Sequence, residues 1–264
     1  RDTCCDEDTI LELLQLNSKM GRIDSARGLL SSIPNKVKQI DKGKWSIQLG
    51  EWGKALEIFE AQDSPNLSNL IECYGNLQLW DNIQKLKPQF ENMSIDEKIN
   101  NSIWYAWSEF HANNLENAKY YMKFFPDENS LDIILFNCIF LIASKQYEEA
   151  ELSISNGYKV LAQNLSVFNG NDNKETSKRL KFAQHLRELQ EALEMKKSGK
   201  NETLEVWENR ILNYSHESES WMKLIEICSL VLSPETHSRT YLKAFSVLRK
   251  ERKWQLIDAY WKRF

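Results

Sequence analysis

Glycine and proline are scarce in this chain, with 9 and 5 of them among 264 residues. β-Sandwiches and barrels need many turn residues between short alternating strands, so this scarcity argues against both classes. Polar residues recur with helical spacing instead. With 42% hydrophobic and 27% charged residues, the composition is that of a soluble globular chain that can bury a substantial core. The sequence therefore predicts an all-α protein.

Three further absences exclude classes of function. The formal net charge of −4 gives no global basic excess, so no nucleic-acid partner is expected. The 5 cysteines form no C-x-x-C pair, which argues against a disulfide framework or a zinc ribbon and favours a reducing compartment. The longest apolar stretch, from Ile133 to Ala143, has roughly half of the ~20 residues that a membrane span requires. It predicts a buried helix, and no transmembrane segment is expected.

Motifs for catalysis are also missing from the sequence. The four histidines are far apart, and none has a second histidine or a cysteine at metal-ligand spacing. No glycine-rich phosphate loop and no nucleophile elbow occurs. The abundant carboxylates, such as Glu148, Glu149 and Glu151, are attributed to solvated helix faces. We therefore predict no catalytic, cofactor-binding or metal-binding residue in this chain.

Capping chemistry places several helix boundaries. The sequence from Ser94 to Glu97 is a capping box, in which a serine and a glutamate satisfy each other's main-chain N–H groups, so a helix should begin there. A serine followed by a proline predicts two more helix starts, at Ser64-Pro65 and Ser233-Pro234. Gly50 follows an apolar-periodic run and predicts a helix end.

A large residue recurs shortly after several predicted turns. The first five occurrences are 29, 28, 35 and 32 residues apart, which is the period of stacked helical hairpins. The last occurrence follows an interval with room for about three more units of that length. We expect each large residue to open the second helix of a hairpin and to pack against the first. The aligned residues are Ile23, Trp52, Trp80, Leu115, Tyr147 and Trp254.

One helical turn after the large residue comes a small or apolar residue, as in Ala55, Ala118 and Ala150. It lies on the same helix face and allows the two backbones of the hairpin to approach closely. One hairpin cannot bury its apolar face alone, so hairpins of this kind stack. The predicted fold is a superhelical solenoid of antiparallel helical hairpins, similar to TPR and HEAT repeats. It forms a single segment over residues 1–264, with an exposed loop at the polar residues 169–178.

Basic residues gather in two places. The first cluster, at 174–200, is mixed with Glu188, Glu191 and Glu194, which predicts a charge-laced helix. The second, from Arg249 to Lys253, is compact enough to contact an acidic partner. The nine tryptophans are expected to pack in the core rather than to stack on bases.

The sequence from Glu226 onward, EICSLVLSPETHSRTYLKAFSVL, resembles a stretch in the FAT domain of the target of rapamycin (TOR) kinases. These are phosphatidylinositol 3-kinase-related protein kinases. In that family the stretch runs Ser-Leu-Val-Val-Ser-Pro, four variable positions, Arg-Thr, an aromatic residue and Leu-Lys. The residues at matching positions are Ser229, Leu230, Val231, Ser233, Pro234, Arg239, Thr240, Tyr241, Leu242 and Lys243.

The resemblance extends over most of the chain, from about Trp45 to Trp254. The helix expected at His185–Lys196 is similar to the family's Leu-Ser-Glu-Leu-Glu-Glu helix, and the sequence around Trp52 to its Glu-Trp-x-x-Ala units. One family run, Gly-Glu-Ser-Tyr-Ser-Arg-Ala-Tyr, is reduced here to KETSKRLKF.

The resemblance implies a regulatory scaffold. A FAT solenoid clamps around the kinase domain of its own polypeptide and takes part in a dimeric complex with a Raptor-like substrate-recruiting subunit and a WD-repeat propeller subunit. Phosphoryl transfer from ATP with Mg²⁺ to serine or threonine would belong to a domain outside this sequence. The implied location is cytoplasmic, and peripheral at endomembranes through the parent complex. Because the sequence lacks an initial methionine and ends within a helical pattern, we expect a piece of a longer protein.

Two alternatives to this scaffold remain at this point: an unrelated all-helical enzyme, for which the sequence offers no catalytic motif, and a free-standing adaptor. A free-standing TPR-like adaptor that binds peptides on its concave face would also account for Trp52 and Tyr147, although not for the stretch from Ser233 to Lys243. Within that stretch, Ser233 and Pro234 are expected to start a helix. Arg239 is expected to be packed or paired, with a direct partner contact as the competing interpretation.

Overall fold

The computed structural model describes residues 7–20, 22–32, 39–126, 130–166, 173–199, 207, 209, 218–232, 234–251 and 254–261. Within these ranges the regular elements are helices, and no strand occurs in them. In chain order the helices are α1 (Glu7–Lys19), α2 (Ile23–Ser32), α3 (Gln39–Gln48), α4 (Trp52–Glu60), α5 (Leu67–Asn76), α6 (Trp80–Lys85), α7 (Lys87–Phe90), α8 (Ile95–His111), α9 (Leu115–Met122), α10 (Leu131–Ala143), α11 (Tyr147–Ser166), α12 (Asn173–Ser198), α14 (Ser218–Val231), α15 (Pro234–Lys250) and α16 (Trp254–Trp261). The prediction of an all-α helical-repeat protein is confirmed.

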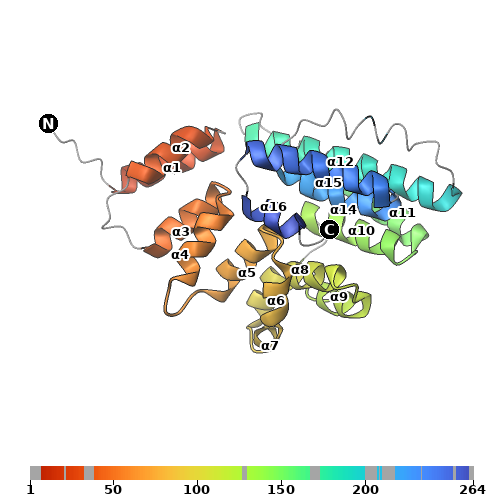
Figure 1. Ribbon diagram of the computed structural model, residues 1–264, viewed down its shortest axis with the longest axis horizontal. Helices are drawn as coiled ribbons and strands as arrows, with labels where there is room; N and C mark the ends of the chain where they lie inside the picture. Colours follow the sequence, from red (N-terminus) through yellow and green to blue (C-terminus); the bar gives the residue numbers. More distant parts are fainter. Residues whose placement is uncertain are drawn as a thin grey trace.

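Successive helices pack in pairs. The hairpins are α1 with α2, α3 with α4, α5 with α6, α8 with α9, α10 with α11, and α15 with α16. Figure 1 shows the first of them following one another along the long axis, from red α1 to green α10. The long helices α12 and α14 pack on α10 and on each other, and α15 packs on α14. The arrangement is a stack of hairpins that thickens towards its C-terminal half.

Four of the hairpins contain the same closing turn. Gly50, Gln78, Asn113 and Lys145 all have a left-handed backbone, with φ between 56° and 69°. In each turn the next residue donates its N–H to the carbonyl five positions earlier, at 2.8 to 2.9 Å. The left-handed residue donates to the carbonyl three positions earlier, at 2.9 to 3.1 Å. This is the Schellman arrangement, which satisfies the free carbonyls at a helix end with main-chain donors alone.

The second helix of each hairpin begins at the large residue aligned in the sequence. Helices α2, α4, α6, α9, α11 and α16 begin at Ile23, Trp52, Trp80, Leu115, Tyr147 and Trp254. In the four closing turns this residue comes two positions after the left-handed one. The residue one helical turn later is fully buried at Ala26, Ala55, Ile83, Ala118 and Ala150. A small or compact side chain therefore lies where the paired helices meet.

The boundaries differ from the prediction in two places. The start at Ser64-Pro65 is wrong, because Asn66 caps α5 by accepting the N–H of Asn69 at 3.1 Å. An asparagine amide oxygen reaches a first-turn N–H as well as a serine hydroxyl does, so sequence alone does not choose between them. The predicted loop also differs: α12 begins at Asn173, so residues 173–178 are helical, and residues 169–172 lie outside the described part of the chain.

The predicted start at Ser94 is confirmed. Ser94 accepts the N–H of Glu97 through Oγ at 3.3 Å, and its own N–H donates to Oε2 of Glu97 at 2.9 Å. These hydrogen bonds from Ser94 hold the pKa of the Glu97 carboxyl below its ordinary value. The carboxylate therefore stabilises α8 at neutral pH, and this contribution is lost as the pH falls through the lowered pKa.

Replacing Ser94 with alanine should lower the free energy of unfolding by about 1 kcal/mol at neutral pH, because the N-cap acceptor is lost. The difference between the two proteins should shrink as the pH falls through the lowered pKa of Glu97, because the protonated carboxyl no longer gives α8 the stabilisation of its charge. Urea unfolding at several pH values measures this difference. Ser94→Asp, which keeps a cap acceptor, is the matched control, and a loss that stays constant with pH would contradict the role given to Glu97.

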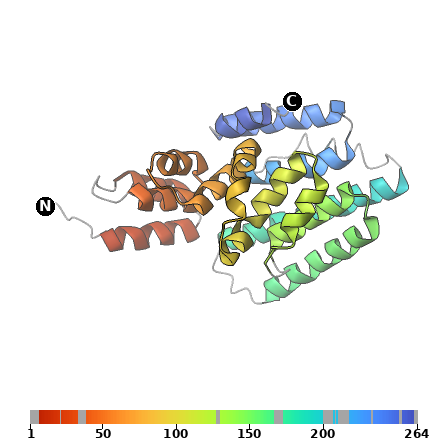
Figure 2. The same ribbon diagram turned by 90° about the horizontal axis from the view of Figure 1, so that it is seen from below.

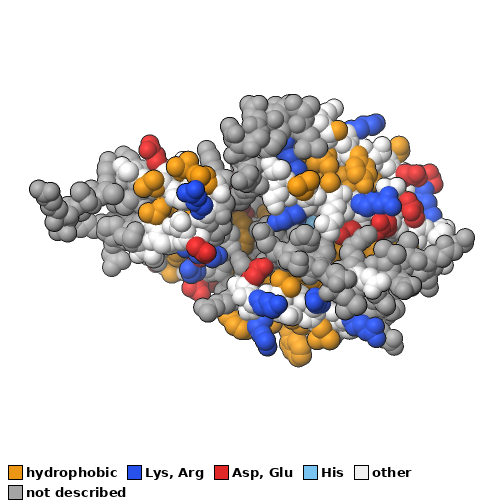
Figure 3. Space-filling view, turned by 90° about the horizontal axis from the view of Figure 1, so that it is seen from above, with side chains coloured by type: hydrophobic (Ala, Val, Ile, Leu, Met, Phe, Trp, Pro, Cys, Tyr) orange, Lys and Arg blue, Asp and Glu red, His pale blue; other side chains and the backbone are white. Residues whose placement is uncertain are grey.

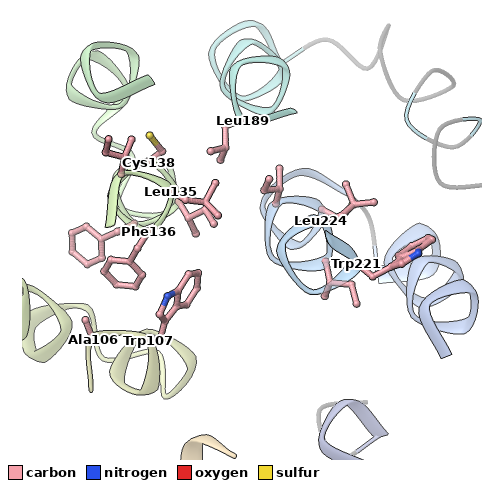
Figure 4. Close-up of a cluster of buried hydrophobic side chains, with 14 of the residues drawn as sticks. Ala106, Trp107, Leu135, Phe136, Cys138, Leu189, Trp221 and Leu224 are labelled. Atoms are coloured by element: carbon pink, nitrogen blue, oxygen red, sulfur yellow. The ribbon is translucent and has the colours of Figure 1, made fainter. Parts of the chain in front are cut away.

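The core consists of two clusters. The smaller one comprises Leu14, Ala26 and Leu49 and joins α1, α2 and the end of α3. The larger one runs from α4 to α16. In its centre Trp107 of α8, Phe136 of α10, Leu189 of α12 and Leu224 of α14 converge (Figure 4). Helix α10 is buried on nearly all sides, which confirms the buried helix expected over its apolar run.

The hairpin period is lost in the C-terminal half. Helix α12 alone takes up 26 residues, close to the length of a complete earlier unit, and no turn divides it. A helix of that length spans several neighbours at once, and α12 packs against α10, α11 and α14. The prediction of about three further units of regular length does not describe this part of the chain.

Candidate functional site

The stretch that resembles the FAT domain connects α14 to α15 and divides into an inner and an outer part. Thr240 is fully buried and Tyr241 is buried, whereas the side chain of Leu242 is 63% exposed. Lys243 is half-buried. Ser229 is exposed, and its hydroxyl donates to the carbonyl of Glu226 at 2.6 Å. The inner residues belong to the core and the outer ones are available for contacts.

Three residues of the stretch need separate mention. Ser233 lies outside the described residues, and Pro234 is the first residue of α15. Arg239 is exposed, and it forms no ion pair with any residue that the structure describes. Among the described residues, Arg239 is therefore neither buried nor part of an ion pair. An exposed guanidinium group can donate hydrogen bonds to a partner.

The predicted repeat anchors do not all pack in the same way. Trp52, Trp80 and Tyr147 are half-buried against the larger cluster. Trp254 opens α16, but it is 57% exposed, which is more than these three anchors and leaves most of it outside the core. The core position of that hairpin is taken by Leu256, two residues later. A tryptophan on the boundary of an amphipathic helix can face either way, and the spacing alone does not decide which.

An aromatic and ionic junction between α8 and α14 was missed from the sequence. His111 stacks on Trp80 and Trp107, with ring centroids 4.8 and 5.6 Å apart. Two side chains of α14 reach these rings. Oε1 of Glu226 lies 3.5 Å from Nε2 of His111, and Nζ of Lys223 lies 5.4 Å from the centre of the Trp107 ring. The junction links helices more than a hundred residues apart, so no local pattern could have indicated it.

Several carboxylates are buried, contrary to the prediction of solvated faces. Glu188 and Glu191 of α12 are buried, and Nδ1 of His185 lies 2.9 Å from Oε2 of Glu188. On α8, Glu109 is fully buried and pairs with Lys87. Glu148 and Glu151 are exposed, as expected, and Figure 3 shows acidic and basic side chains side by side towards one end of the molecule. Each buried carboxylate named here faces a cation or a histidine, which is an arrangement that stabilises a fold.

The described cysteines are not set up as nucleophiles. Cys73, Cys138 and Cys228 are buried and unbridged. Burial raises the pKa of the Cys73 thiol to about 12 and that of Cys138 to about 11. A thiol needs a lowered pKa to react as a thiolate at neutral pH. Cys4 and Cys5 lie outside the described residues.

A shallow groove of 260 Å³ lies between α11 and α12. Its floor includes Ile154 and Leu193, and Lys197 crosses it to Glu148 and Glu151, at 3.3 and 2.6 Å. Pockets for cofactors and drug-sized ligands are usually larger, about 300–1,000 Å³, and more apolar. Among the described residues, no group of three or more histidine, cysteine, aspartate or glutamate side chains is placed to hold a metal ion. Over the same residues, each helix is too short or too polar to cross a bilayer.

Comparison with known proteins gives the chain a family. The family model of the FAT domain matches residues 70–257. The serine/threonine-protein kinase mTor of Drosophila melanogaster is 24% identical over 93% of this chain and 10% of its own length. TOR of Oryza sativa subsp. japonica and TOR2 of Saccharomyces cerevisiae are each 22% identical, over 89% and 92% of this chain.

The chain spans about a tenth of the length of these relatives. The family model begins within α5 and ends within α16, so it includes the aromatic and ionic junction, the long helices α12 and α14, and the stretch from Ser229 to Lys243. The match covers well over half of the chain. The chain therefore belongs to the FAT domain family, in the form that the target of rapamycin kinases carry.

Proposed function

We propose that this chain is part of the helical scaffold of a TOR-type serine/threonine protein kinase and acts by holding and regulating the kinase domain of the same polypeptide. The observation that carries the proposal is the FAT family match over residues 70–257. The continuous core from α4 to α16 supports it, because a scaffold transmits force only if its units move together. The chain forms a single solenoid segment in this proposal.

The chemistry of the described residues suits a scaffold better than a catalyst. Glu109 and Glu188 are buried beside Lys87 and His185, and burial raises the pKa of the Cys73 and Cys138 thiols, which keeps them protonated. Phosphoryl transfer requires acidic ligands for Mg²⁺ and a group that orients the attacking hydroxyl. In this proposal ATP and Mg²⁺ bind to a kinase domain elsewhere in the parent protein.

The proposal includes the assembly of a complex. The parent would be a homodimer with a Raptor-like subunit and a WD-repeat propeller subunit, located in the cytoplasm and at the surface of endomembranes through that complex. The exposed outer residues of α15 are the part of the FAT-like stretch that can reach such neighbours. A free-standing TPR-like adaptor leaves the stretch from Ser229 to Lys243 without a role.

Two measurements test the proposal. The purified 264-residue chain, incubated with ATP and Mg²⁺, should transfer no phosphate to a protein substrate, and phosphorylation by this chain alone would overturn it. In the full-length parent, lysine cross-linking should connect exposed lysines of this chain, such as Lys159 and Lys250, to the kinase domain. Cross-links that stay within the helical repeats would contradict the clamp.

A variant of Arg239 tests whether the outer part of the stretch regulates the kinase. Arg239→Ala in the parent should leave the melting temperature unchanged, because the side chain is exposed and unpaired among the described residues. The kinase activity should change, since a contact to a neighbouring part would be lost. Lys119→Ala, an exposed change on α9, is the control. Equal activity of both variants and the wild type would assign Arg239 no regulatory contact.

A further inference from the structure

One side of α15 is exposed along most of the helix. Arg239, Leu242, Ser246 and Arg249, at helical spacing, are all exposed, while Thr240, Ala244 and Leu248 are buried on the opposite side. In Figure 2 the dark blue α15 forms one long edge of the molecule. We call this row of four residues, together with Trp261 of α16, the outer face of α15.

The outer face has an apolar centre. The side chains of Leu242 and Trp261 are 63% and 68% exposed. The half-buried Phe245, three residues after Leu242 on α15, has its ring centroid 6.2 Å from that of Trp261. Other strongly exposed large side chains, such as Leu152 on α11, are not part of such a row. Grouped apolar side chains on a soluble surface mark contact sites more often than isolated ones do.

The charges around this centre are mostly positive. Arg239 and Arg249 lie at either end of the row, with Lys243 and Lys250 beside them. Among the side chains that the structure describes here, the exposed acids are Glu251, just after α15, and Asp258 of α16. The local excess of cations contrasts with the net charge of −4 for the whole chain. A partner that covers this face must therefore bring apolar side chains for its centre and carboxylates for its ends.

We propose that the outer face of α15 binds an acidic amphipathic helix of a partner protein. The apolar side of that helix packs on Leu242 and Trp261, and carboxylates near its two ends pair with Arg239 and Arg249.

The spacing of the two arginines sets the length of the partner helix. Arg239 and Arg249 are ten positions apart, or about 15 Å along the helix axis. A partner helix of about three turns spans this distance. Helices commonly bind in this way, with apolar anchors at one helical turn and charges at the edge. Arginine suits the edge because it can pair with a carboxylate through two N–H groups.

The inference goes beyond the regulation of a kinase domain, because it requires only the folded chain. It is tested with a fluorescein-labelled synthetic peptide of 18 residues that carries leucine and phenylalanine on one side of a helix and glutamate on the other. Its charge-inverted counterpart carries lysine in place of glutamate. Fluorescence anisotropy with the purified 264-residue chain should show binding of the acidic peptide that weakens with salt, and little binding of the basic one.

Two double variants locate the site. Each should weaken the binding of the acidic peptide about tenfold or more. One combines Leu242→Ser with Trp261→Ser, and the other combines Arg239→Glu with Arg249→Glu. The controls, Leu152→Ser and Lys159→Glu, change equally exposed residues on α11 and should leave binding within about twofold. All these side chains are exposed, so circular dichroism melting should be unchanged in every variant.

Three results would overturn the proposal. The first is absence of binding up to about 1 mM peptide, which means that the free energy of binding is weaker than about 4 kcal/mol. The second is equal binding to the double variants and the wild type. The third is displacement of the peptide by a single-stranded oligonucleotide at lower concentration, which would assign the cationic and aromatic side chains of this face to nucleic acid instead.

Discussion

Replacing Phe136 with alanine is expected to lower the free energy of unfolding by about 3–5 kcal/mol. Phe136 is fully buried on α10, and its ring centroid lies 4.7 Å from that of Trp107 on α8, at 71°. Phe110 and Phe125 also meet it edge to face, at 6.1 and 5.8 Å. The substitution therefore leaves a cavity between α8 and α10, where the α8–α9 hairpin packs against the α10–α11 hairpin. A domain of this kind has a total stability of only about 5–15 kcal/mol, so a large share would be lost.

Urea unfolding followed by tryptophan fluorescence measures the effect of this substitution. Phe136→Leu keeps most of the volume and should cost about 1.5 kcal/mol or less. Leu152→Ala removes an exposed side chain on α11 and should change stability by less than about 0.5 kcal/mol. If Phe136→Ala behaved like Leu152→Ala, the contact between α8 and α10 would contribute little to the free energy of unfolding.

Gly75→Ala is expected to destabilise the chain by about 1–3 kcal/mol or more, through overlap rather than through a cavity. Gly75 lies near the end of α5, where the indole of Trp104 on α8 covers it. A Cβ atom at this position would overlap the ring carbons of Trp104. Either Trp104 must leave its position or α5 and α8 must separate. Both changes loosen the packing of the α5–α6 hairpin against the α8–α9 hairpin.

The same substitution at Gly28 should have the opposite sign. Gly28 lies within α2, and a Cβ atom there meets nothing within 4 Å. Alanine at this position should therefore stabilise the chain by about 0.5–1 kcal/mol, because it favours the helix without a clash. Thermal unfolding of both variants measures the contrast. Equal shifts of the melting temperature would show that helix propensity alone decides at Gly75 and that the contact with Trp104 carries no weight.

The sequence predicted the order of the hairpins well, for a physical reason. The second helix of a hairpin must begin with a residue that packs back on the first, and such residues are large and occur once per unit. Trp52, Trp80 and Tyr147 carried this signal clearly. Two of the four closing turns carried no signal, because Gln78 and Lys145 adopt the left-handed backbone that usually identifies glycine and, less often, an asparagine such as Asn113. Their stabilisation comes from main-chain hydrogen bonds, which the residue type does not reveal.

The candidate site was predicted less completely. Burial of a single charge depends on which distant helix covers it, and Glu226 and His111 meet only because α14 packs near α8. A carboxylate at such a position has the same helical spacing as one in solvent. The exposure of Arg239 and Trp254 has the same origin, since the outward direction is defined by the assembled stack. Family resemblance located the stretch, but it did not divide the stretch into inner and outer residues.

The spacing of the large residues that open the second helices limits how units of this stack can change in length. The large residues at Trp52, Trp80, Leu115 and Tyr147 are separated by 28, 35 and 32 residues. Each residue added to a helix rotates everything after it by about 100°, so three, four or seven added residues nearly restore the original direction. The spacings here differ by three, four and seven residues. Insertions of that size leave the next hairpin facing its neighbour, whereas one or two extra residues would turn its apolar side into solvent.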